Sequence, residues 1–257
     1  MRSLRYASVL SALVVVVACG ASDGGSASSA SSGGVPGEGG ASPDADGVPG
    51  PDGEVLDTAP PPPPVYVKST PETTTFGGQA RKYNLSVPLD YDASKSYPLV
   101  LSFHGSPGTA DGMLAVYPFD SASHQEAIIA YPNALGSDWD LGTATAQNPD
   151  LGFTKALVDE LAGKLSIDKT RVYGFGWSGG GFFVNQVACR LRGLLRAMAV
   201  HAGGAPYADI NPGGLKYPNG QPKCAADQGP IATLVVHGDQ DDTVPFMGGD
   251  FDAHYWA

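Results

Sequence analysis

The chain has 257 residues, of which 42% are apolar and 16% are charged, so it can form one large or two small domains with a core. Its formal net charge of −11 argues against a nucleic-acid partner, because contact with a polyanion needs clustered Lys and Arg. We interpret the excess of acidic residues as a feature that favours solubility.

Residues 1–19 have the pattern of an export signal. Arg2 and Arg5 precede a run of twelve apolar or small residues, 7–18, which is too short to cross a bilayer as a helix. The run ends in VVAC, which resembles a bacterial lipobox. We therefore expect Cys19 to be the lipid-modified first residue of an exported, membrane-anchored protein. The alternative is an ordinary cleaved signal with an incidental cysteine.

Residues 20–65 consist mostly of Gly, Ser, Ala, Pro and Asp, with almost no large apolar side chain. Such a segment buries too little surface to offset the entropy that ordering would cost. We expect it to be a disordered tether between the membrane and a folded domain, residues 66–257.

The domain alternates strand-like and helix-like segments. We expect strands at 81–88, 98–103, 127–131, 171–175, 196–203 and 232–238. Helices are expected at 153–165, where apolar residues recur on one face, and at 182–191. This alternation predicts an α/β fold with a mostly parallel sheet.

The pattern G-x-S-x-G occurs at 176–180, between an apolar strand and a helical stretch. A hydrolase nucleophile needs this strand–turn–helix setting, in which a tight turn lifts Ser178 above the sheet. Because the turn has no room for bulk, it requires Gly176 and Gly180. The backbone N–H of Gly179, at the helix start, can then bind an oxyanion. The alternative is a glycine-rich turn whose serine only caps the helix.

A second turn, His104–Gly105–Ser106, follows the strand at 98–103. We expect the backbone N–H of Ser106 to be the second oxyanion donor. The His104 ring is expected to pack internally and brace the loop.

Three acids follow the strand at 232–238 and compete for the role of the catalytic acid: Asp239, Asp241 and Asp242. An Asp beyond a strand, after the serine in chain order, suits a Ser–Asp–His hydrolase. Their spacing fits no EF-hand loop, so calcium is not expected. We expect no metal and no cofactor.

Two cysteines, Cys189 and Cys224, remain once Cys19 is assigned to lipid. In an oxidising exported compartment, two thiols predict one disulfide. Two separate buried thiols are the alternative.

Five segments of the domain form an ordered series: ARKYNLSVPLDYD, YPLVLSFHG, AIIAYPNA, LSIDKTRVYGFGWSGGG and HGDQDDTVPF. Through them, residues 77–256 resemble the exported esterases that include polyhydroxybutyrate depolymerases, feruloyl esterases and acetylxylan esterases, of α/β-hydrolase fold. The resemblance implies that Asp241 is the acid, and it favours the disulfide between Cys189 and Cys224. It also implies a serine esterase that acts on feruloyl or acetyl esters of polysaccharides, or on polyesters.

The general base is the part of the site that the sequence lacks. A serine hydroxyl is a poor nucleophile unless a base takes its proton. In the resembled family this base is a histidine in a GGGH-like loop, beyond one more helix and strand, and the chain stops at FDAHYWA. We expect a truncated esterase with feeble activity at most, whose strand at 232–236 lies close to an uncovered sheet edge.

Five histidines could replace the missing base. His254 follows Asp241 in the required order, although it lies where the family has its next helix. The other four are His104, His124, His201 and His237.

Two further classes of function remain open. One is a non-catalytic, hydrolase-like binding module on a tether, and the other is a peptidase of the same fold. Trp139, Trp177 and Phe182 are candidate surfaces for an aryl group, although aromatic residues in such positions usually belong to the core.

Overall fold

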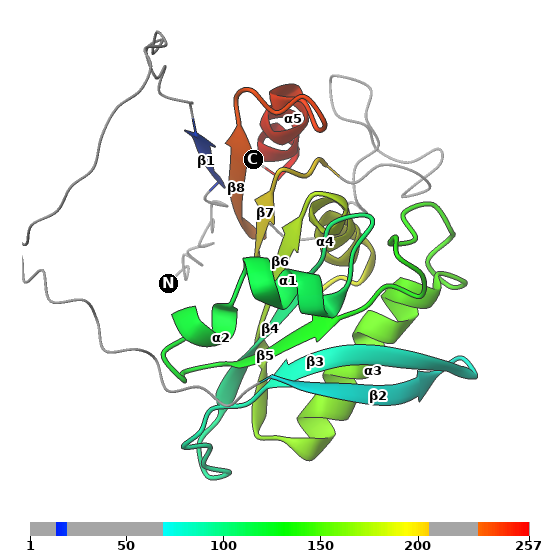
Figure 1. The fold of residues 1–257 in the computed structure, drawn as a ribbon, viewed down its shortest axis with the longest axis vertical. Coiled ribbons are helices and arrows are strands. Elements are labelled where there is room, and N and C mark those ends of the chain that lie inside the picture. The colour runs from blue at the N-terminus through cyan, green and yellow to red at the C-terminus, as the bar shows by residue number, and fades with distance from the viewer. Residues whose placement is uncertain (1–13, 20–68, 206–230, 257) are drawn as a thin grey trace, which may run out of the picture. The chain divides into compact units, whose positions relative to one another are not determined.

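The computed structural model describes residues 14–19, 69–205 and 231–256. Within these ranges, strands form one sheet in the order β1-β8-β7-β6-β4-β5-β3-β2 (Figure 1). The strands are β1 (Val14–Cys19), β2 (Thr70–Phe76), β3 (Gln79–Ser86), β4 (Tyr97–Phe103), β5 (Ile128–Pro132), β6 (Ile167–Trp177), β7 (Ala197–His201) and β8 (Ala232–Gly238). All neighbours from β1 to β5 are parallel, whereas β2 and β3 form an antiparallel margin. The predicted α/β fold with a mostly parallel sheet is confirmed.

Helices cover both faces of the sheet (Figure 1). The helices are α1 (Ala110–Val116), α2 (Phe119–Ala122), α3 (Pro149–Lys164), α4 (Gly179–Arg190) and α5 (Phe246–Trp256). α1 and α2 lie over a small apolar cluster around Met113, Ile129 and Tyr131. α3 and α4 pack on the other face over the main core, which includes the fully buried Phe103 and Phe183. Both predicted helices therefore form where the apolar pattern placed them.

The sheet edge beside β8 differs from the expectation. β1, a part of the expected export signal, runs parallel to β8 with Val14 opposite Thr233 and Cys19 opposite Gly238. An open strand edge presents unpaired N–H and C=O groups, and an extended neighbouring segment can satisfy them. In this structure the edge of β8 is therefore covered.

Several sequence predictions concern the ends and the cysteines. The tether at 20–65 and Cys224 lie outside the described residues. Cys189, on α4, is buried and disulfide-bonded. Among the described residues, no helix has the length and apolar character needed to cross a membrane.

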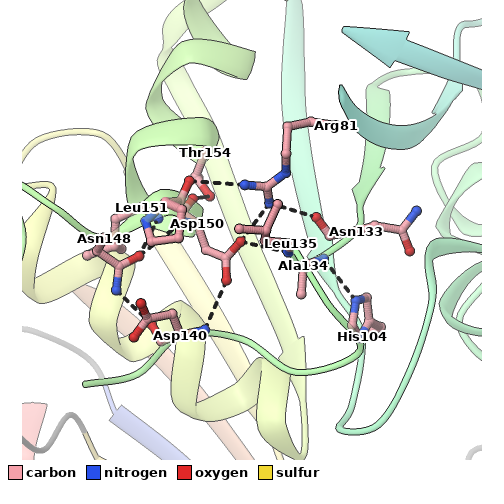
Figure 2. A network of polar contacts seen from close by, with 11 residues as sticks. Arg81, His104, Asn133, Ala134, Leu135, Asp140, Asn148, Asp150, Leu151 and Thr154 are labelled. Atoms are coloured by element: carbon pink, nitrogen blue, oxygen red, sulfur yellow. Dashed lines mark hydrogen bonds and ion pairs between the residues drawn. The ribbon is translucent and has the colours of Figure 1, made fainter. Parts of the chain in front are cut away.

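A buried ion pair ties the antiparallel margin to α3 (Figure 2). Arg81 on β3 and Asp150 in the first turn of α3 lie 2.6 Å apart, with side chains only 2% and 1% exposed. The Asp150 carboxylate also accepts the backbone N–H groups of Leu135 and Asp140, both at 2.9 Å. Arg81 in turn donates to the Asn133 carbonyl at 3.0 Å. One carboxylate and one guanidinium thus hold the loop from 133 to 140 against the sheet and α3.

We expect Arg81→Met to lower the free energy of unfolding by about 3–5 kcal/mol, because it leaves the Asp150 carboxylate buried without its cation. Urea unfolding followed by fluorescence measures the loss. Lys155→Met is the matched control, since it removes the exposed pair with Asp159 and should change stability by less than about 1 kcal/mol. Equal losses in the two variants would contradict a special role for the buried pair.

α5 attaches to α4 through a second buried carboxyl group, that of Asp252. Its Oδ2 accepts the Asn185 side-chain N–H at 3.1 Å, and Asn185 Oδ1 accepts the indole N–H of Trp256 at 2.6 Å. Asp252 Oδ1 has no hydrogen-bond partner among the described residues. Burial raises the pKa of Asp252 to about 7. This helix contact therefore favours the neutral carboxyl group.

The raised pKa makes stability depend on pH in a defined direction. Between about pH 4 and 7 the unfolded chain loses this proton before the folded chain does, so the free energy of unfolding falls as pH rises. Asp252→Asn should remove this part of the slope and raise stability at neutral pH by roughly 1–4 kcal/mol relative to the wild type. Urea titrations across that pH range measure the slope. The exposed-site variant Asp239→Asn should keep the wild-type slope, and an unchanged slope in Asp252→Asn would refute the assignment.

Candidate active site

The carboxyl ends of the parallel strands bring the predicted site residues to one edge of the sheet. Ser178 follows β6, the turn at 104–106 follows β4, and Asp241 follows β8. His201 is the last residue of β7, opposite Trp177 in the register with β6. In open α/β sheets, ligands bind outside this end of the strands. The sequence positions chosen for the chemistry thus share one edge.

Ser178 forms a sharp turn between β6 and α4. Its backbone has φ 51° and ψ −118°, in the left-handed region that disfavours residues other than glycine. Its N–H donates to the His201 carbonyl at 2.9 Å, and its carbonyl accepts the Gly181 N–H at 2.8 Å. The side chain makes no helix-capping hydrogen bond. The serine is therefore strained, and the capping alternative does not describe it.

Glycines allow this turn to form. A Cβ on Gly176 would lie 2.0 Å from the Gly180 carbonyl oxygen, and a Cβ on Gly180 would lie 2.1 Å from the Phe103 carbonyl oxygen. Both distances are far below contact with backbone atoms that have no freedom to move. Each glycine of the motif is thus required by close approach of the chain to itself.

The two predicted oxyanion donors lie next to one another. Gly179 begins α4, where the first N–H groups have no partner inside the helix and the helix dipole is positive. The Ser106 nitrogen lies 3.0 Å from the point that a Cβ of Gly179 would occupy. A Cβ of Gly105 would lie 3.4 Å from the Ser178 Cβ. The turn after β4 therefore packs directly on the serine turn.

Asp241 is the best held of the three acids after β8. Its Oδ1 accepts the backbone N–H groups of Val244 at 2.9 Å and Thr243 at 3.0 Å. The Val244 hydrogen bond is the main cause that lowers the pKa of Asp241, and the nearby His237 and His201 add to it. Asp239 and Asp242 are exposed. Asp241 is thus a fixed carboxylate, and its Oδ2 lies 3.6 Å from His237 Nε2.

All five histidines lie within the described residues, and none of their rings hydrogen-bonds the Ser178 hydroxyl. His237 is fully buried, and its Nε2 donates to the Val244 carbonyl at 2.6 Å while lying 3.6 Å from Asp241. His201 Nδ1 bonds the Tyr117 hydroxyl. The exposed His254 bonds the Asp250 carbonyl of its own helix at 2.7 Å.

The remaining two histidines lie in other settings. His104 is buried and bonded to its own loop, as its expected bracing role requires, and His124 is exposed after α2. Burial lowers the pKa of His201, and the His237 ring acts in the same direction. No sequence pattern pointed to Tyr117 as the partner of His201, because the two are 84 residues apart.

An apolar hollow of about 980 Å³ lies between Phe182 of α4, the loop at 243–245 and α5. Phe182 of α4, Val244, Pro245, Met247 and Phe251 contribute to its walls. Met247 is 79% exposed, which is unusual for so apolar a side chain.

The other two candidate aromatic residues lie elsewhere. Trp139 is buried and stacks on Phe183 with ring centres 4.4 Å apart, so it belongs to the core. Trp177 packs beside Tyr117, with ring centres 6.0 Å apart. Phe182 is therefore the one of the three that lines the hollow.

Potential metal-ligating side chains do not gather in the part of the chain that the structure describes. Among those residues, no group of three or more His, Cys, Asp or Glu side chains is arranged to hold a metal ion. The groups that the structure places at this edge of the sheet are the Ser178 hydroxyl, the Asp241 carboxylate, the His201 ring and backbone N–H groups.

Sequence comparison relates the chain to fungal esterases. No family model matches it. A protein of Aspergillus niger named "Probable feruloyl esterase C" is 29% identical over 175 residues, covering 66% of this chain and 58% of that protein. Feruloyl esterase C of Emericella nidulans is 27% identical, with the same coverage of both chains. The chain thus spans less than two thirds of the length of these relatives.

Solved structures show the same architecture. An acetyl xylan esterase from Aspergillus awamori superposes with a TM-score of 0.57 at 18% identity, covering 70% of this chain and 76% of that one. A ferulic acid esterase of Anaeromyces mucronatus, solved with ferulic acid, gives 0.54 at 20% identity, covering 74% and 78%. The chain therefore has the α/β-hydrolase fold of these esterases.

The turn geometry predicts the result of adding one methyl group. Gly176→Ala should lower the free energy of unfolding by about 2–3 kcal/mol, because its Cβ collides with the Gly180 carbonyl. Gly163→Ala, in α3 with nothing within 4 Å of the added Cβ, is the matched control and should be neutral or slightly stabilising. Thermal unfolding followed by circular dichroism compares them. A Gly176→Ala protein as stable as the wild type would mean that the turn is looser than described.

Proposed function

We propose that this chain carries the nucleophile, acid and oxyanion hole of a serine carboxylic-ester hydrolase. Ser178 is the nucleophile, Asp241 is the acid, and the N–H groups of Ser106 and Gly179 bind the oxyanion. The observation that carries the proposal is the strained Ser178, whose side chain caps nothing and which adjoins both donors. Strained residues of this kind cluster at active sites.

The reaction proceeds in two steps. Ser178 Oγ attacks the ester carbonyl carbon and loses its proton to a base, while the carbonyl oxygen becomes an oxyanion bound by the two N–H groups. Collapse of this intermediate breaks the C–O bond to the alcohol, which leaves with the proton. Water then attacks the acyl-serine in the same way and releases the acid.

We propose that none of the five histidines is the base of an efficient triad. Three observations support this: His237 donates to a carbonyl, His201 is bonded to Tyr117, and His254 is bonded within α5. In this proposal Asp241 orients the histidine of a complete triad. Hydrolases that lack a triad member retain roughly 10³–10⁴-fold acceleration over water, so feeble turnover is expected of these 257 residues.

The substrate class follows from the hollow and the relatives. An apolar hollow beside Phe182 suits an aryl or alkyl acyl group, and the similar proteins are named feruloyl and acetyl xylan esterases. We therefore propose feruloyl or acetyl esters of polysaccharides as substrates, with polyesters as the alternative. No cofactor takes part.

The remaining features fit an exported protein. We propose that Cys19 carries the lipid that anchors the protein in the bacterial envelope, and that 20–65 is the tether. In this proposal residues 1–18 are removed, so the mature protein no longer has Val14–Ala18 of β1 beside β8. Cys189 pairs with Cys224 in this proposal, since Cys189 is disulfide-bonded and exported compartments are oxidising.

One observation favours a second function. Among the described residues, no histidine ring hydrogen-bonds the Ser178 hydroxyl, and such an arrangement also suits a non-catalytic module that only binds esters in the hollow beside α5. Such a module would have no use for a reactive serine.

Acylation by an activated ester separates the two functions. Incubated with p-nitrophenyl acetate, the full chain should gain one acetyl group on Ser178, seen by mass spectrometry, because slow deacylation lets the adduct accumulate. Ser178→Ala is the control and should gain none. Absence of acetyl-Ser178 in the wild type would support the binding module.

Steady-state turnover of the same ester tests the missing base. It should be feeble in the wild type and should change less than about tenfold in the single Ala variants of His124, His201, His237 and His254. Rapid turnover that His254→Ala or His201→Ala abolishes would refute that part of the proposal.

A further inference from the structure

We infer that His104 is a positioning residue of the oxyanion hole, holding the Gly105 carbonyl so that the Ser106 N–H stays turned away from it, toward the serine turn. The inference rests on the proposed function, because it concerns one of the two proposed donors. It gives a role in the reaction to a buried ring that touches no substrate.

The hydrogen bonds of His104 define its protonation state. Nδ1 lies 2.7 Å from the Gly105 carbonyl oxygen, which can only accept, so Nδ1 carries a hydrogen. Nε2 lies 3.2 Å from the Ala134 N–H, which can only donate, so Nε2 offers its lone pair (Figure 2). The ring is therefore neutral, in the Nδ1–H form. It is 1% exposed, and burial lowers the pKa of His104, which keeps it neutral.

The planar peptide bond links the position of the Gly105 carbonyl to the direction of the Ser106 N–H. The Gly105–Ser106 bond is trans, so the Gly105 C=O and the Ser106 N–H lie in one plane and point in opposite directions within it. When Nδ1–H fixes the carbonyl on the His104 side, the N–H has to leave on the other side. The serine turn borders this peptide, since the Ser106 nitrogen is 3.0 Å from the Cβ position of Gly179.

The ring itself is fixed on several sides. Trp139 packs against it with ring centres 4.7 Å apart, and the Trp139 indole N–H donates to the His104 carbonyl at 2.8 Å. Ala134 belongs to the loop that Asp150 holds. A Cβ on Gly108 would lie 2.3 Å from the Gly105 oxygen and 2.8 Å from His104 Nδ1. Little space is left for the carbonyl or the ring to rotate.

The test compares two replacements of His104. His104→Phe keeps a ring against Trp139 but removes the donor, whereas His104→Asn offers a side-chain N–H close to the position of Nδ1. Both are mixed in full-length protein with p-nitrophenyl acetate, and the first-turnover release of p-nitrophenolate is measured against ester concentration. The wild type and Ser178→Ala are run in parallel.

His104→Phe should lower the saturating acylation rate about 10- to 100-fold with little change in the ester concentration for half-saturation, because an oxyanion donor acts in the transition state. His104→Asn should recover a large part of the loss. Equal rates in wild type and His104→Phe, or a change confined to half-saturation, would overturn the inference. Loss in both variants with normal thermal unfolding would also overturn it.

A spectroscopic readout keeps this result apart from the proposed function. Long-range ¹H–¹⁵N NMR should show His104 as the Nδ1–H form, and the Ser106 amide resonance should shift in His104→Phe and move back toward wild type in His104→Asn. An Nε2–H form, or an unmoved Ser106 amide, would overturn the inference even if Ser178 is acylated. Failure of Ser178 acylation with the expected NMR result would instead count against the proposed esterase and confine His104 to shaping the loop.

Discussion

The backbone geometry at the site edge depends on the interactions of one buried carboxylate, that of Asp150. It is paired with Arg81 from β3 and accepts backbone N–H groups of Leu135 and Asp140. A buried charge needs such complete pairing, because each unpaired contact costs desolvation energy. Through this loop, the same carboxylate reaches Ala134 and His104, and so the turn that packs on Ser178 (Figure 2). The buried Asp150 carboxylate thus helps to fix the backbone of the turn at 104–106, at the carboxyl end of the sheet.

Much of the fold was predictable because periodicity reports which side chains are buried. The runs at 98–103 and 127–131 became β4 and β5, and the pattern at 153–165 became most of α3. α3 begins earlier because the Asn148 side chain caps it, accepting the N–H groups of Asp150 and Leu151. The ion pair could not be predicted, since Arg81 and Asp150 are 69 residues apart and each looks like an ordinary surface charge in sequence. The covered edge of β8 was likewise missed, because a long-range strand pairing leaves no local pattern.

The candidate site likewise contains residues that could be predicted from the sequence and contacts that could not. The positions around Ser178 were readable because a tight turn restricts residue types, and the motif G-x-S-x-G records that restriction. Asp241 could be chosen only through the resemblance to esterases, since three acids lie within four positions. The histidine partners were not readable at all: the bond between His201 and Tyr117 depends on how β7 and the end of α1 meet in space. Asp252 shows the same limit, because its burial follows from where α5 packs.

The backbone conformation of Ser178 costs the protein stability. A non-glycine residue with positive φ costs about 1–3 kcal/mol, and glycine at this position would relieve most of that cost. The Ser178 hydroxyl does not offset this cost, because it makes no helix-capping hydrogen bond. A protein under pressure for stability alone would therefore drift toward glycine here. Thermostability engineering guided only by backbone strain would choose the same replacement, and would remove the proposed nucleophile.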